Sequence, residues 1–180
     1  MKTTLSNSNN TFNGLPKFQL KVDEKLIRGR SVNCPWRLHK MKKEGITQII
    51  DLRNTSTIER PIERFFCNLL GLKYINVRYP NRLNTVPAIE FFEKINNLIR
   101  SNNGKSYIHC EYGKRRTGIC VALYKKMNTD KSAKEIIEEM LDIGYKELIQ
   151  KHFSPKKRKS KKIFTDFIKK YFPEEIKRLD

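Results

Sequence analysis

The chain has 180 residues, of which 38% are hydrophobic and 10% aromatic, and it carries a formal net charge of +19. This length and balance predict one globular domain with a core of its own, and no run of apolar residues is long enough to cross a bilayer. The charge favours phosphate-rich partners but does not choose among nucleic acid, inositol phosphates, anionic lipid and acidic protein.

The N-terminal segment is rich in Ser, Thr and Asn and lacks the apolar centre of a secretory signal. We therefore expect a flexible tail at residues 1–16, followed by one domain over residues 17–180. The cysteines show neither metal-type pairing nor the density of a disulfide scaffold, so an intracellular, cytoplasmic location is expected. These cysteines are Cys34, Cys67, Cys110 and Cys120.

From Lys25 onward, short β-prone runs alternate with segments of helical periodicity. Strands are expected at Leu26–Arg28, Thr47–Leu52, Lys73–Val77 and Ser106–His109. Helices are expected at 35–45, 58–70 and 86–100, after Arg116, and at 132–141. This alternation predicts an α/β fold, in which one compact domain has a short, mostly parallel central sheet flanked by helices.

Further helices are expected toward the C-terminus, interrupted by a strongly basic segment at 154–162. Like charges so close together repel one another, and we therefore expect a solvated loop there. The block Lys156–Lys162 could also act as a nuclear-targeting signal, a nucleic-acid contact or an anchor to a membrane surface.

A strand that ends at His109 is followed by Cys110, a polar turn with Gly113, and a helix that opens near Thr117. Backbone amides of such a turn converge on one anion, and the helix N-terminus adds partial positive charge at the same point. Cys110 is favoured there as a thiolate, and hence as a nucleophile. Arg116 can grip two phosphate oxygens while the sulfur attacks phosphorus, and the Thr117 hydroxyl can help the sulfur to leave.

Residues 109–118 read His-Cys-Glu-Tyr-Gly-Lys-Arg-Arg-Thr-Gly and resemble the signature of the cysteine-dependent protein-tyrosine and dual-specificity phosphatases. The segments 27–31 and 49–53 look like two upstream landmarks of compact dual-specificity-like members, so the resemblance extends from Leu26 to about Leu148. It implies hydrolysis of phosphate esters through a phosphocysteine intermediate, with no metal and no cofactor.

The resemblance also implies roles for individual residues. Cys110 would carry the phosphoryl group, Arg116 would stabilise the transition state, and His109 would hold the cysteine backbone. Asp51 and Arg53 end their strand near the loop, where they could support it or touch substrate, although structural pairing is the simpler interpretation. The implied phosphate-binding residues are Glu111, Tyr112, Gly113, Lys114, Arg115, Arg116 and Thr117.

One feature of the family is missing. Members usually carry an aspartate, on the loop after the third strand, that protonates the leaving oxygen, and this chain has Asn81 at about that place. Glu111 could be the acid instead, as in the similar loop of the myotubularin-like lipid phosphatases. Alternatively, the substrate could be a phosphoanhydride, as for the RNA 5′-triphosphatases of this superfamily, or the chain could bind phosphate esters or RNA with weak turnover.

The expected substrate is a phosphoprotein, which is the default of the family. The alternative is a non-protein polyanion: an inositol phosphate, a phosphoinositide or an RNA 5′-triphosphate end. Gly113 followed by Lys114 is similar to phosphoinositide phosphatases and to small fungal and plant enzymes that act on inositol pyrophosphates. Lys114 and Arg115 would surround such a substrate or merely raise the local anion concentration. Nucleic acid or an anionic membrane surface could contact the basic face, and the sequence does not indicate an oligomeric state.

Overall fold

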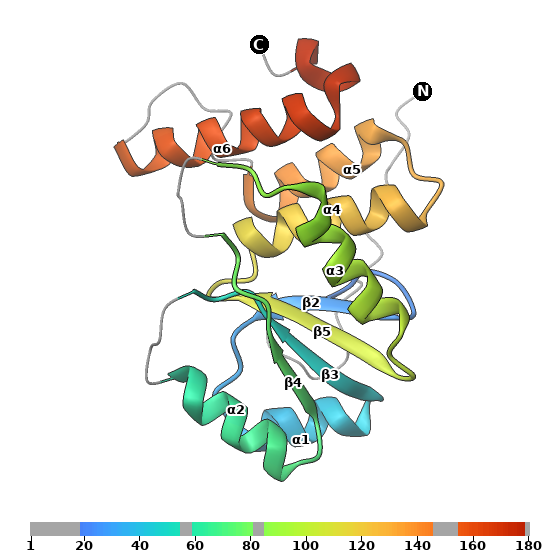
Figure 1. The fold of residues 1–180 in the computed structure, drawn as a ribbon, viewed down its shortest axis with the longest axis vertical. Helices are drawn as coiled ribbons and strands as arrows, with labels where there is room; N and C mark the ends of the chain where they lie inside the picture. The colour runs from blue at the N-terminus through green and yellow to red at the C-terminus, as the bar shows by residue number, and fades with distance from the viewer. Residues whose placement is uncertain (1–18, 55–58, 81–84, 146–154, 179–180) are drawn as a thin grey trace, which may run out of the picture.

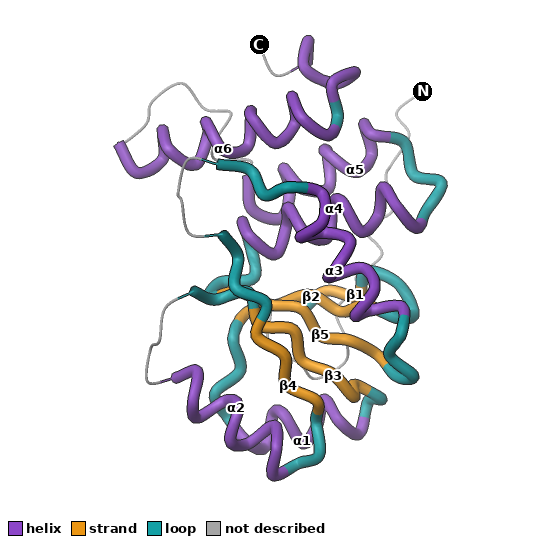
Figure 2. The backbone as a smooth tube through the Cα atoms, in the orientation of Figure 1, coloured by secondary structure: helices purple, strands orange, loops and turns teal. Residues whose placement is uncertain are grey.

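The computed structural model describes residues 19–54, 59–80, 85–145 and 155–178 (Figure 1). The tail expected at residues 1–16 and the position Asn81 lie outside this part of the chain. The described residues form one α/β unit with a central sheet between two layers of helices, as Figure 2 shows. The predicted fold class is therefore confirmed.

The sheet has five strands in the order β1-β2-β5-β3-β4. The strands β2, β5, β3 and β4 run parallel, and only the short β1 at the edge is antiparallel, which the sequence analysis did not predict. The carboxyl ends of parallel strands meet at one edge of the sheet. The segments that directly follow β2, β3, β4 and β5 therefore lie close together at that edge. The strand bounds are Leu20–Lys21, Leu26–Arg30, Ile46–Asp51, Lys73–Asn76 and Lys105–Cys110.

Helices cover both faces of the sheet. The lower layer in Figure 1 consists of α1 (Pro35–Lys43) and α2 (Glu59–Leu69). The opposite layer contains α3, α4, α5 and α6, at Ile89–Arg100, Arg115–Asn128, Ala133–Met140 and Pro155–Tyr171. A π-helical turn at Leu141–Tyr145 follows α5, and a 3₁₀ helix at Pro173–Arg178 follows α6. None of the helices in the described residues has the length and apolarity needed to span a bilayer.

Side chains of alternate residues in the central strands pack into two separate hydrophobic cores, one on each face of the sheet. Ile49 and Tyr107 pack in the core that includes α1 and α2, whereas Ile50 and Ile108 pack in the core of α3 and α4. A strand covered on both faces reads as a continuous apolar run, which is why these strands were visible in the sequence. The two cores hold β5 in the middle of the sheet. Its last residue, Cys110, lies at the edge where the carboxyl ends of the parallel strands meet.

The basic segment predicted as a loop at 154–162 is helical from Pro155 onward, and this corrects the prediction. Proline is well suited to the first turn of a helix, and Lys and Arg are good helix formers. Three apolar side chains of α6, Phe164, Phe167 and Ile168, are buried in the core. Each contributes roughly 1.5–3 kcal/mol, which outweighs like-charge pairs that cost about 0.2–0.5 kcal/mol each.

Candidate active site

The loop of residues 111–114 joins the centre of the sheet to α4. Cys110 is the last residue of β5 and its side chain is only 4% exposed, while α4 begins at Arg115. Gly113 has a φ of 68°, a backbone conformation that favours glycine. A Cβ atom there would lie 2.3 Å from the carbonyl carbon of Gly29, so the loop packs directly on the backbone of β2. The structure thus has the strand–loop–helix junction that the sequence predicted.

Two side chains of the first turn of α4 lie at this junction. Arg116 is half-buried, and its Nη1 lies 3.4 Å from the carbonyl oxygen of Leu52, just beyond the end of β3. Its guanidinium is therefore held at the strand-end edge of the sheet. Thr117 is fully buried, and its hydroxyl makes no hydrogen bond within the described residues. That hydroxyl remains available to donate to a thiolate.

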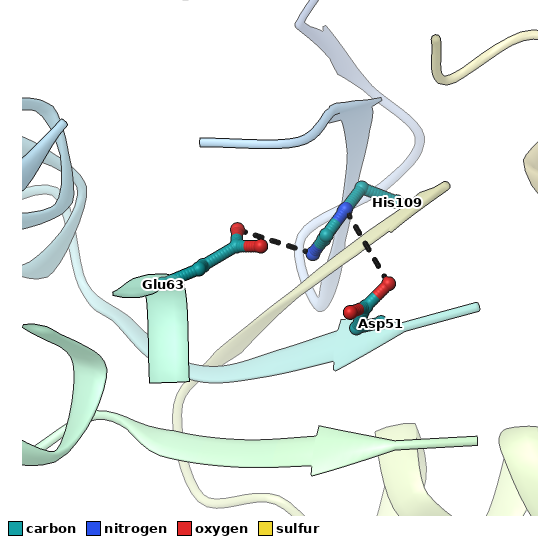
Figure 3. Close-up of side chains that lie close together, drawn as sticks. All are labelled: Asp51, Glu63 and His109. Carbon is teal, nitrogen blue, oxygen red and sulfur yellow. Dashed lines mark ion pairs between the residues drawn. The ribbon is translucent and has the colours of Figure 1, made fainter. Parts of the chain in front are cut away.

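His109 lies beneath the loop, within a buried charged cluster drawn in Figure 3. Its Nδ1 is 3.1 Å from the carbonyl oxygen of Cys110, which is the contact needed to hold the cysteine backbone. Its Nε2 is 3.3 Å from Oε1 of Glu63, and its Nδ1 is 3.9 Å from Oδ1 of Asp51. The ring thus links the nucleophile's backbone to carboxylates from α2 and β3.

Arg53 completes the cluster by joining the two carboxylates. Its Nε lies 3.0 Å from Oδ1 of Asp51, its Nη2 lies 3.0 Å from Oδ2 of Asp51, and the same Nη2 donates to Glu63. Tyr74 donates its hydroxyl hydrogen to Asp51 at 2.5 Å. Asp51 and Arg53 are therefore buried partners of one another beneath the loop, which agrees with the structural interpretation of their sequence positions.

Glu63, like Tyr74, is a residue of this cluster that sequence reasoning missed. It is completely buried on α2, and its Oε1 also accepts a hydrogen bond from the Val32 amide at 3.1 Å. The sequence did contain a sign that Glu63 is buried. Positions 63, 66, 67 and 70 fall on one face of a helix, and the other three are Phe66, Cys67 and Leu70. A carboxylate on the inward face of a helix indicates a buried partner.

The two carboxylates have opposite pKa shifts. Burial would raise the pKa of Asp51, but the neighbouring His109 and the hydrogen bonds from Arg53 and Tyr74 outweigh it, so the pKa is lowered. For Glu63 burial dominates, and its pKa is raised despite the favourable charges of His109 and Arg53. Ligand atoms of Asp51, Glu63 and His109 come within 4.8 Å of one another, yet Arg53 contacts both carboxylates and would repel a metal ion.

Exposed cations occur on the segments at the carboxyl ends of the parallel strands and at the start of α4. Lys114 and Arg115 are exposed at its end, and Arg30 is exposed beside Cys110, which it faces across the β2–β5 pair. Arg78 is exposed after β4, on a segment whose neighbouring amides bond to the carbonyl oxygens of Asp51 and Leu52. Glu111 is half-buried and Tyr112 is 69% exposed. We call the four exposed cations of these segments the basic rim.

Solved structures of cysteine phosphatases share this fold. TpbA from P. aeruginosa is 13% identical with a TM-score of 0.63, and the match covers 89% of this chain and 87% of that chain. The Siw14 catalytic core from S. cerevisiae, described as a PP-IP phosphatase and solved with citrate, is 20% identical with a TM-score of 0.64, covering 91% of each chain. No curated protein matches the chain.

The fold and the junction at Cys110 are those of the protein-tyrosine and dual-specificity class of phosphatases. Residues 20–163 match the family described as "DSP-PTPase phosphatase fused to NAD+ Kinase", and the chain belongs to this family. It is therefore a cysteine-dependent phosphatase, as the resemblance in the sequence implied.

Proposed function

We propose that this phosphatase acts on small polyanions that carry several phosphate groups, above all on phosphoanhydride bonds such as those of inositol pyrophosphates. The observation that carries the proposal is the basic rim, formed by Arg30, Arg78, Lys114 and Arg115. Several cations can neutralise a substrate with several phosphates, whereas one phosphotyrosine needs only the loop and Arg116. The structural similarity to Siw14, itself described as a PP-IP phosphatase, also supports a substrate with several phosphate groups.

The reaction proceeds in two displacements at phosphorus. The Cys110 sulfur attacks, a sulfur–phosphorus bond forms, and the bond from phosphorus to the leaving oxygen breaks. Loop amides and the Arg116 guanidinium bind the equatorial oxygens and stabilise the charge that they carry in the transition state. Water then attacks phosphocysteine, phosphate departs, and the Thr117 hydroxyl donates to the returning thiolate. Elsewhere in the site, His109 holds the carbonyl of Cys110 in place.

A panel of substrates at one salt concentration tests the proposed class. We expect inositol pyrophosphate to be hydrolysed with a kcat/KM at least about tenfold above that of a phosphotyrosine peptide, because the rim adds about 1.4 kcal/mol or more. The double variant Lys114→Gln with Arg115→Gln should remove most of this preference. Lys73→Gln, which changes an exposed cation at the amino end of β4, is the control. A higher kcat/KM for the peptide would contradict the proposal.

The choice of a phosphoanhydride also predicts how Glu111 behaves. The leaving group of a phosphoanhydride is already a stable phosphate anion, so protonation of the leaving oxygen contributes little to the rate. We expect Glu111→Gln to change turnover of inositol pyrophosphate by less than about threefold, with the pH–rate profile retained. A loss of roughly 10²–10⁴-fold together with loss of the alkaline limb would identify Glu111 as the general acid instead.

A further inference from the structure

The carboxyl end of β2 runs alongside the phosphate loop. In the parallel β2–β5 pair, Arg30 lies opposite Cys110. Beyond that point Ser31 donates its amide hydrogen to the carbonyl oxygen of Glu111 at 3.3 Å, and its hydroxyl lies 3.4 Å from the same oxygen. Two residues before Arg30 in β2, Nη2 of Arg28 donates to the carbonyl oxygens of residues 113 and 114, at 2.8 and 3.1 Å. Three loop carbonyls are thus occupied from one side.

These contacts determine which way the loop amides point. In a planar trans peptide the carbonyl of one residue and the N–H of the next point in opposite directions, and no described peptide bond of this chain is cis. Because the carbonyls of Glu111 and Gly113 bond to groups of Ser31 and Arg28, the N–H groups of Tyr112 and Lys114 point away from those two residues. An anion bound over Cys110 needs its donors in that direction.

Arg28 is an unusual residue for a buried position, since it is an arginine that is only 4% exposed. A buried guanidinium is costly unless its hydrogens are bonded, and two of its acceptors belong to the loop. The pocket beside it is also lined by Lys125 and Glu139, which bond to each other. The two hydrogen bonds place the Arg28 guanidinium directly behind the loop.

We propose that Arg28 is a positioning residue of the phosphate site, which holds the loop carbonyls outward so that its amides face the phosphoryl group. This inference rests on the proposed role of the loop in binding phosphate. A planar fork can bridge two carbonyl oxygens, whereas a lysine ammonium at this site would reach one of them. The landmark at residues 27–31 contains Arg28 but does not indicate this role, because Arg28 precedes Gly113 by 85 positions.

The test measures binding of inorganic phosphate to Cys110→Ser protein with and without Arg28→Met. We expect the added substitution to weaken phosphate affinity at least about tenfold, since one or two loop peptides are free to reorient, and Arg28→Lys to recover part of the loss. With Cys110 present, Arg28→Met should raise KM for inositol pyrophosphate as well as lower kcat, because both ground and transition states use the amides.

Lys125→Met is the matched control, because it removes another buried cation from the same pocket without touching the loop. We expect Lys125→Met to keep the phosphate affinity within about twofold of the parent protein. This should hold even if the substitution lowers the midpoint of urea denaturation, which measures stability. Unchanged phosphate affinity in folded Arg28→Met or Arg28→Lys protein would overturn the inference. An equal loss in Lys125→Met would also overturn it, and failure of the parent Cys110→Ser protein to bind phosphate would overturn the proposed function with it.

Discussion

Cys110→Ser lowers turnover by roughly 10⁴-fold or more, because a serine hydroxyl is not ionised near neutral pH. The amides of the loop and the Arg116 guanidinium remain, so phosphate still binds. Release of phosphate from a small aryl phosphate measures the loss. Rapid acid quenching of the wild-type protein with substrate should show phosphorus bonded to the Cys110 sulfur by mass spectrometry.

The other thiols serve as controls for this variant. Burial raises the pKa of Cys67 to about 12, so it stays a neutral thiol and cannot replace the nucleophile. Cys34 is half-buried and lies outside the loop, just before α1. We expect Cys34→Ser to retain activity within about twofold. Full turnover by Cys110→Ser, or phosphorus found on another residue, would remove the mechanism.

Arg53→Met has the largest expected effect on stability. It leaves Asp51 and Glu63, both fully buried, without the guanidinium that bridges them. Breaking a buried ion pair by removing one partner costs about 3–5 kcal/mol in the free energy of unfolding. Urea denaturation measures this loss at neutral pH. Arg64→Met, at an exposed position of α2, should change the free energy by less than about 0.5 kcal/mol.

The pH dependence of this loss follows from the two carboxylates. In the native protein the pKa of Asp51 is lowered, so it adds stability above its unfolded value of about 3.9, which is lost as pH falls through the native value. Glu63 has a raised pKa, so its contribution decreases as pH rises from about 4.3 through that value. In Arg53→Met both acids bind protons more readily, so the deficit should shrink as the pH falls from neutral toward the unfolded values of about 3.9 and 4.3. A deficit that grows on acidification would contradict this account.

The sequence determined the catalytic loop because its chemistry is contiguous. Residues 109–118 carry the nucleophile, the turn glycine, the arginine and the helix start on one short stretch, so their spacing alone predicts how they meet. The alternating apolar runs predicted the α/β fold for the same local reason. The basic segment at 154–162 was misjudged because its repulsion is visible in sequence, whereas the buried residues that hold α6 act through tertiary packing.

Only the tertiary structure decided what lies beneath and behind the loop. Glu63, Arg53 and Asp51 come from α2 and the end of β3, and parallel pairing of β3 with β5 is what brings them to His109. Arg28 meets the loop because β2 pairs on the other side of β5. Charges so far apart in the chain interact only after the strands are ordered, since the low dielectric that strengthens them exists only in the folded core.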